Sequence, residues 1–580
     1  MTKPILLGVL FCFFSLSALL AQSPPNILLI MSDDQGWGDL HRHGNEHIDT
    51  PVLDALGQES LRFDRFFVSP VCAPTRASLL TGRDYLRTNT YAVTGRGVAM
   101  RSEEVTIAEI LQSDGYRTGI FGKWHNGEQY PHHPLGQGFD EFLGFCGGHW
   151  NRYENPTLEH NGKMQTYEGY ITDLLTDAAI DFMEDAQDEP FFCYLPYNVP
   201  HAPFQVADHY FEKYKRKGLD DKTAAVYGMV ENMDENIGRL LRALDSLQKT
   251  KNTIVIFLTD NGPNGHRYNG DMKGIKASVD EGGVRVPCFI RYPDGLPQNT
   301  TITQMAAHID MLPTLVALAG LSVPDSLALD GINLLPLMKG YSTDWPDRTL
   351  FTHYSGKAVT SRPGGVRTQN HRLVMNRSGE TLLYDMVEDP GQQTSITSRK
   401  PTLAETLASK YQQWYGQVTR NLEELPIPVG YAEMPAAVLP AHEATLSGEI
   451  HYQFDNGYTN DWITHWTTTK DTIRWPIEVV RDGEYTVWME YANDPKNAGA
   501  LIQVTAGDQT ITHPLKEAFP LKTIPVVNHT PPGNHVDAHW KRVRLGKINL
   551  TQGQYSLHLR AVDIPGEEVG QFKSLSLEME

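Results

Sequence analysis

The sequence has few cysteines and a shortage of positive charge. Its 580 residues include five cysteines, and 50 basic side chains stand against 70 acidic ones, for a formal net charge of −20. So acidic a chain is not expected to bind nucleic acid, because phosphate backbones attract basic surfaces. An anionic substrate would need a local basic patch within an acidic protein.

The cysteines are too widely spaced to form a recognisable framework. Beyond Cys12, which lies in the apolar N-terminal segment, they are Cys72, Cys146, Cys193 and Cys288. This spacing indicates neither a disulfide framework nor a zinc site. We interpret the last three as buried thiols, whereas Cys72 lies in a motif of its own.

Long hydrophobic runs are absent after the first 21 residues, so no later segment is expected to span a bilayer. Lys3, an apolar run from Pro4 and the small residue Ala21 form the pattern of a signal peptide, residues 1–21. A membrane anchor is the alternative, but the run is marginally short for one. The sequence predicts an exported protein, periplasmic or secreted, with no membrane span after signal cleavage.

Residues 22–349 alternate between strand-like and helix-like patterns. Residues 26–31 and 253–258 are short apolar runs, typical of buried strands in a parallel sheet. Between them, residues 223–248 carry apolar side chains at the spacing of an amphipathic helix. Strands that alternate with helices predict an α/β fold.

The pattern changes after residue 350. Residues 350–425 predict a small antiparallel sheet followed by a helix from Thr402 to about Arg420. Prolines in residues 426–441 suggest a linker. Residues 442–580 contain extended runs with period-two alternation, which predicts a β-sandwich. The tryptophans of this last part fit either core packing or stacking on sugars.

Two pairs of oxygen-bearing side chains follow predicted strands. Asp33 and Asp34 end the first run, and Asp260 and Asn261 end the later one. Sites in open α/β sheets form beyond the carboxyl ends of strands, and such oxygens suit calcium or magnesium. Each pair could instead be a helix cap or a turn former.

A third motif, Cys72-Ala-Pro-Thr-Arg76, has the features of a helix start. Pro74 suits the first turn and Gly82 suits the end, so Cys72 is expected just before a helix N-terminus. The unpaired backbone N–H groups at a helix N-terminus favour an anion, and the Arg76 guanidinium adds positively charged donors for an oxyanion. Cys72 is therefore a candidate nucleophile for an anionic ester, with a buried core cysteine as the alternative.

Residues 25–420 resemble the type I, formylglycine-dependent sulfatases, an arylsulfatase-like family of the alkaline phosphatase superfamily. The resemblance rests on six motifs in order and on two short segments, Leu383–Asp385 and Glu388–Pro390. The motifs are Asn26–Asp39, Cys72–Arg83, Gly122–His125, Asn198–Pro203, Leu258–Gly262 and Lys276–Pro287.

The resemblance implies an alkaline-phosphatase-like central mixed sheet flanked by helices, with a small antiparallel C-terminal subdomain. The additional β-sandwich lies beyond the part that resembles the family. A formylglycine-generating enzyme would oxidise Cys72 to formylglycine (3-oxoalanine), whose hydrate attacks the sulfur of a sulfate ester. Calcium would be held by Asp33, Asp34, Asp260 and Asn261, together with the modified Cys72.

The resemblance also assigns roles to five basic residues. Arg76 would steady the formylglycine, and Lys123 and Lys276 would hold sulfate oxygens. His125 would take the proton from the hydrate, and His201, which also contacts substrate, would protonate the leaving alcohol. The family often has an aromatic residue at position 280, where this chain has Asp280, and nearby Lys273 is an alternative to Lys276.

The predicted function is hydrolysis of sulfate esters, on a sulfated carbohydrate. One alternative is a phosphatase or phosphodiesterase of the same superfamily, which would use two transition metals and Ser or Thr. The other is a catalytically silent glycan-binding protein with unmodified Cys72. Loops at residues 147–152, 264–267 and 353–354 are candidates for substrate selection.

Overall fold

The computed structural model describes residues 23–341, 345–354, 356, 358–526, 528–531 and 533–579. The expected signal peptide, residues 1–21, lies outside the described residues. Within them, no helix is both long and apolar enough to cross a membrane.

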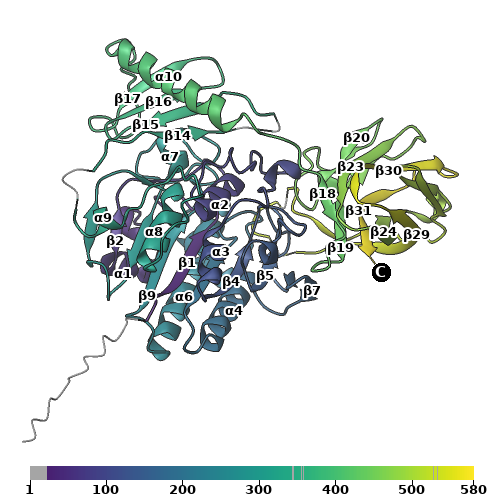
Figure 1. Ribbon diagram of the computed structural model, residues 1–580, viewed down its shortest axis with the longest axis horizontal. Helices are drawn as coiled ribbons and strands as arrows, with labels where there is room; N and C mark the ends of the chain where they lie inside the picture. Colours follow the sequence, from purple (N-terminus) through teal and green to yellow (C-terminus); the bar gives the residue numbers. More distant parts are fainter. Residues whose placement is uncertain are drawn as a thin grey trace, which may run out of the picture.

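A ten-stranded mixed sheet forms the centre of the larger part of the molecule (Figure 1). In spatial order its strands are β12 (Thr300–Ile302), β2 (Leu61–Phe63), β11 (Cys288–Arg291), β9 (Thr253–Thr259), β1 (Asn26–Ser32), β8 (Phe191–Pro196), β4 (Arg117–Lys123), β5 (Glu141–Phe145), β6 (Thr157–His160) and β7 (Lys163–Thr166). The five strands from β9 to β5 are parallel, whereas β11 and β6 run antiparallel to their neighbours on either side. The sheet is therefore mixed, as the resemblance implied, and not purely parallel.

Helices cover both faces of this sheet because its central strands are apolar on both sides. Ile27 and Leu29 of β1 pack on the face with α2 (Cys72–Thr81), α3 (Ile107–Ser113) and α8 (Met311–Leu318). Leu28 and Ile30 pack on the opposite face, with α1 (Pro51–Glu59), α4 (Ile171–Asp185), α5 (Asp208–Arg216) and α6 (Asp221–Ser246). The predicted α/β core is confirmed.

A four-stranded antiparallel sheet follows, at the top of Figure 1, with α10 (Pro401–Val418) beside it. Its strands are β14 (Leu350–His353), β15 (Gly364–Arg367), β16 (His371–Met375) and β17 (Thr381–Asp385). Leu407, Tyr411 and Trp414 of α10 pack against Val366 and Leu373 of the sheet. The predicted small sheet and its helix are both present.

Two further sheets form the C-terminal sandwich, at the right of Figure 1. One contains β18 (Ile427–Val429), β23 (Thr472–Val479), β30 (Gly553–Asp563), β25 (Leu501–Ala506) and β26 (Gln509–Pro514). The other contains β21 (His451–Tyr452), β22 (Ile463–Thr464), β31 (Gln571–Met579), β24 (Gly483–Ala492) and β29 (Lys541–Leu550). Trp466 and Trp475 are buried in the core between the sheets.

The linker expected at residues 426–441 is corrected by this structure. β18 pairs with β23, and β19 (Ala436–Pro440) pairs with β31, so the stretch belongs to the sandwich. The prolines suggested a linker, but Pro428 lies in a strand at the edge of its sheet, where proline is tolerated.

Candidate active site

Neighbouring strand ends bring the two predicted oxygen pairs together. β1 and β9 are parallel and in register, with Ser32 beside Thr259, so both strands end at the same edge. The residues that follow are Asp33 and Asp34 on one side and Asp260 and Asn261 on the other. The Asp260 amide donates to the Ser32 carbonyl at 3.1 Å, which fixes this alignment.

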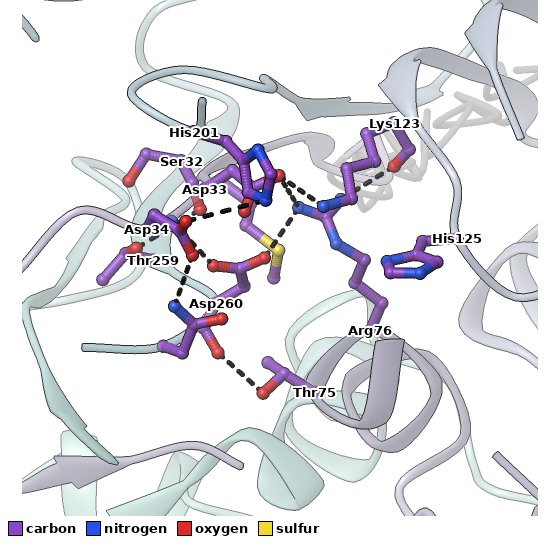
Figure 2. Close-up of polar contacts among 12 residues, drawn as sticks. Ser32, Asp33, Asp34, Thr75, Arg76, Lys123, His125, His201, Thr259 and Asp260 are labelled. Carbon is purple, nitrogen blue, oxygen red and sulfur yellow. Dashed lines mark hydrogen bonds and ion pairs between the residues drawn. The ribbon is translucent and has the colours of Figure 1, made fainter. Parts of the chain in front are cut away.

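The next two strands carry one predicted lysine and the two predicted histidines to the same edge. Lys123 is the last residue of β4, with His125 two positions beyond it, and His201 follows the end of β8. Figure 2 shows Lys123 and His201 pointing toward Asp33 and Asp34, with His125 on the far side of Arg76. The sheet order β9-β1-β8-β4 therefore assembles residues that are far apart in the chain.

Cys72 is the first residue of α2, and its side chain is buried. The helix was expected to begin just after Cys72, so it begins one residue earlier than predicted. The helix N-terminus still favours an anion at Cys72. Arg76, one turn on, donates to the Asp260 carboxylate at 2.9 Å and to the Lys123 carbonyl at 2.7 Å. Thr75 donates to the Asp260 carbonyl at 2.7 Å, so α2 is fastened directly to the end of β9.

Two lysines pair with the two aspartates after β1. Lys123 Nζ lies 2.6 Å from Asp33 Oδ2, and Lys276 Nζ lies 2.6 Å from Asp34 Oδ1. Lys273 lies elsewhere, because its Nζ donates to the Tyr384 hydroxyl at 3.1 Å. The geometry therefore favours Lys276 over Lys273 as the cation of the site.

The oxygen ligands fit a divalent cation. Single ligand atoms of Asp33, Cys72 and Asp260 lie within 4.8 Å of one another. Among the described residues, Asp33 Oδ1 and Asn261 Oδ1 are buried without a hydrogen-bond partner, which is costly unless something binds them. Carboxylate and amide oxygens suit calcium or magnesium, so the donor set fits the predicted ion.

Electrostatics also favour a cation at this position. Burial raises the pKa of Asp260 to about 6, and the neighbouring Asp33 adds to the shift. Burial acts in the same direction on Asp34, but Lys276 and His201 outweigh it and hold its pKa below the ordinary value. Several buried carboxylates in one place repel one another, and a bound cation relieves that repulsion.

The two histidines differ in their surroundings. Burial, with Lys123 and Arg76, lowers the pKa of His125 well below its ordinary value, so its ring is neutral. His201 Nδ1 donates a hydrogen bond to the Ala202 carbonyl at 2.6 Å, and Nε2 lies 3.7 Å from Asp34 Oδ2. Burial and Lys276 lower the pKa of His201 to about 3.

Comparison with known proteins decides the family. The family model described as Sulfatase matches residues 25–321, slightly more than half of the chain. The chain belongs to the sulfatase family. A second model, described as the C-terminal region of N-sulphoglucosamine sulphohydrolase, matches residues 276–416 of this sulfatase, which include the small antiparallel sheet.

Curated relatives and solved structures agree with this assignment. The sulfatase is 32% identical over 411 residues to human N-acetylgalactosamine-6-sulfatase, covering 65% of this chain and 76% of the relative. It is 31% identical to human arylsulfatase A, covering 64% of this chain and 83% of that protein. The crystal structure of Ps i-CgsB in complex with k-i-k-neocarrahexaose is similar at a TM-score of 0.65 and 28% identity, covering 69% and 95% of the two chains. This sulfatase is a sulfuric ester hydrolase.

A cavity of about 360 Å³ in the sulfatase is lined by Cys72, His125, His201 and Lys276 among the predicted groups. His149, Asn264 and Tyr354 also line it, from the loops that the sequence suggested for substrate selection. Tyr458, Thr459, Asn534 and His535 line it from the C-terminal sandwich. No sequence signal pointed to these four, because they lie outside the family motifs and far from them in the chain.

Proposed function

We propose that this sulfatase removes sulfate from a sulfated carbohydrate, with a formylglycine made from Cys72 as the nucleophile and calcium at the strand-end oxygens. The observation that carries the proposal is the meeting of Cys72, at a helix N-terminus, with the oxygen cluster. The proposed calcium ligands are Asp33, Asp34, Asp260, Asn261 and the modified Cys72. A formylglycine-generating enzyme is the partner required for maturation.

The basic residues are suited to holding the sulfate group. Lys123 and Lys276 would donate to its oxygens, and their charges would stabilise the negative charge that grows in the transition state. Arg76 would hold the hydrated formylglycine by hydrogen bonds from its buried guanidinium group. A bound calcium ion supplies Lewis acid chemistry, polarising the sulfate.

Proton transfer would be divided between the two histidines. His125 is neutral, because burial and the nearby Lys123 depress its pKa. Its Nδ1 has no hydrogen-bond partner among the described residues, so this nitrogen is free to take the proton from the hydrate. His201 has the Nε2 edge toward the site and suits the acid that protonates the leaving alcohol. A bound sulfate ester brings negative charge, which raises the pKa of His201 from its low value.

Relatives support a carbohydrate as the substrate. The human relative is named for N-acetylgalactosamine, and the Ps i-CgsB structure contains a neocarrahexaose. A sulfated glycan outside the cell fits the expected export of the enzyme. Removal of residues 1–21, and release to the periplasm or the medium, are part of the proposal.

The test is sulfate release from defined sulfated mono- and oligosaccharides by protein made with the modifying enzyme. Chelation should abolish turnover, and added calcium should restore it. Asp260→Ala should stay inactive with calcium added. Full activity after thorough removal of divalent ions would contradict the calcium site.

Turnover of phosphate esters with two bound zinc ions would favour the phosphatase alternative. Sugar binding without sulfate release, with Cys72 still a thiol, would favour the silent glycan-binding alternative.

A further inference from the structure

Two loops of the C-terminal sandwich reach the cavity above Cys72. The segment between β21 and β22 carries Tyr458 and Thr459, and the segment between β27 (Lys522–Ile524) and β28 (Asp537–His539) carries His535. All three line the cavity of about 360 Å³ that contains Cys72 and His201. A part of the chain outside the family's motifs therefore forms one side of the active site.

The first of these loops is docked on the catalytic part by hydrogen bonds and close packing. The Gly148 amide donates to Thr459 Oγ1 at 3.1 Å, and Asn460 Nδ2 donates to the His149 carbonyl at 3.3 Å. A Cβ added to Gly147 would lie 2.3 Å from Thr459 Cγ2, so only glycine permits this approach.

The second loop is docked in a similar way. Asn151 Nδ2 donates to the Val536 carbonyl at 2.8 Å, next to His535. His529, on the same segment, stacks on Phe211 of α5 with ring centroids 3.9 Å apart. The described residues of both loops that make these contacts are therefore held beside the cavity.

His535 lies across two histidines of the catalytic part. Its ring is perpendicular to His149 with centroids 4.7 Å apart, and its centroid is 6.3 Å from that of His201. Within the part of the chain that the structure describes, His535 Nδ1 and His149 Nε2 are buried with no hydrogen-bond partner. Two desolvated nitrogens beside a cavity indicate that a polar ligand completes their hydrogen bonds.

Tyr458 adds an aromatic surface on the same side. Tyr458 lines the cavity and is 38% exposed. A tyrosine ring offers a flat apolar face, and its hydroxyl a polar edge, a combination suited to a sugar ring. Thr459, which follows it, is already engaged by Gly148 and anchors the loop.

We propose that the sandwich forms a sugar-recognition wall, in which His535 hydrogen-bonds hydroxyls of the sulfated sugar and Tyr458 packs on its ring. The inference rests on the proposed function and names the specificity-determining residues of that site. Burial lowers the pKa of His535 to about 3, with His201 and Lys276 adding to the shift, so the ring is neutral. A neutral imidazole both donates and accepts, as a hydroxyl group requires.

The test compares a sulfated monosaccharide with 4-nitrophenyl sulfate, which has no sugar hydroxyls, using the full-length modified enzyme. His535→Ala should lower kcat/KM on the sugar about 10-fold, mainly through KM, since one hydrogen bond is worth about that much. The same variant should stay within about threefold of wild type on the aryl sulfate. Tyr458→Ala should behave in the same way and covers the case in which His535→Ala does not fold.

The matched control is His558→Ala. His558 is a half-buried histidine of the same sandwich, on β30, and its neighbours across the sheet are Arg474 and Thr505. We expect it to leave both substrates unaffected. His535→Gln, which keeps a donor and an acceptor, should recover part of the loss on the sugar.

Equal losses on both substrates, or no loss on the sugar for either wall variant, would overturn the inference. Failure of the proposed function has a different signature, because the wild-type enzyme itself would then release no sulfate from any sugar.

Discussion

The active site combines two regions built in different ways. The catalytic floor is defined as Cys72, Lys123, His125, His201 and Lys276, and all of these except Lys276, which lies on the loop after β9, are at or after strand ends or at a helix start. Its two lysines and His201 have polar partners, whereas His125 Nδ1 has none among the described residues. The sugar wall, defined as Tyr458, Thr459 and His535, lies on loops of another domain and includes an unpaired buried nitrogen. The difference suggests that sheet geometry fixes the chemistry while loop docking adjusts the choice of substrate.

The largest expected effect separates the two histidines of the floor. A sugar alcohol leaves poorly without a proton, whereas a nitrophenol leaves largely unaided. Loss of a general acid typically costs ~10²–10⁴-fold, so His201→Ala should lose about that much on a sugar sulfate and much less on 4-nitrophenyl sulfate.

His125→Ala is the matched variant, since His125 is expected to act after the alcohol has left. It should slow both substrates alike, with covalent sulfate accumulating at position 72 by mass spectrometry. Equal losses for His201→Ala on both substrates, with trapped sulfate in that variant alone, would reverse the two assignments.

Substitutions of Lys276 and Lys273 test whether Lys276 alone is the lysine of this segment that acts in the catalytic floor. Lys276→Ala removes the ammonium that lies 2.6 Å from Asp34 and should lower kcat on every sulfate ester by ~10²–10³-fold, as for other oxyanion donors. Lys273→Ala, three residues away, removes a contact with the Tyr384 hydroxyl and should change kcat less than about twofold. A larger loss for Lys273→Ala would mean that the wrong lysine has been placed in the site.

A substitution at a residue that does not line the cavity can displace the sugar wall. Gly147→Ala would force Thr459 aside and weaken its bond to Gly148, so the sugar preference should fall about 10-fold while aryl sulfate turnover is retained. Gly416→Ala in α10 is the control, because a methyl group there meets open space among the described residues. Both kcat/KM values should be measured for each variant. An unchanged sugar preference in Gly147→Ala would argue against a docked wall.

The smallest expected effect is that of pH on sugar preference. His535 has a pKa lowered from 6.5 to about 3, so it stays neutral where an ordinary histidine would gain a proton. The charged and titratable groups that affect it are His149, His201 and Lys276. The ratio of kcat/KM on the sugar between wild type and His535→Ala should therefore stay constant from pH 5 to 8, because His201 is present in both proteins and a neutral His535 does not titrate in this range. A step in this ratio near pH 6.5 would contradict the neutral wall.

Sequence patterns could place the two oxygen pairs beside each other because both pairs follow short apolar strands. The run at residues 26–31 and the Asp33-Asp34 pair are adjacent in the chain, and parallel pairing then places Asp260 beside them. The motifs could also place Cys72 at a helix start, within one residue. The mixed sheet was implied by the resemblance and is confirmed, whereas the strand patterns alone suggested a parallel sheet.

The wall could not be predicted, for a physical reason. Docking of Thr459 on Gly148 and of Val536 on Asn151 depends on how the C-terminal part of the chain packs on the catalytic part, and no periodicity in either segment predicts that packing. The same limit explains the linker error at residues 426–441. Prolines mark chain breaks and edge strands alike, and only the pairing of β18 and β19 distinguishes them.

The central claim is that a modified Cys72 performs the chemistry, and one titration tests it most directly. Preparations made with increasing amounts of the formylglycine-generating enzyme should contain an increasing fraction of the Cys72 peptide about 18 Da lighter, because the oxidation replaces the sulfur by oxygen and removes two hydrogens. Sulfate release per molecule should rise in proportion to that fraction and extrapolate to zero for the thiol form. Full activity in a preparation whose Cys72 is entirely a thiol would contradict the account.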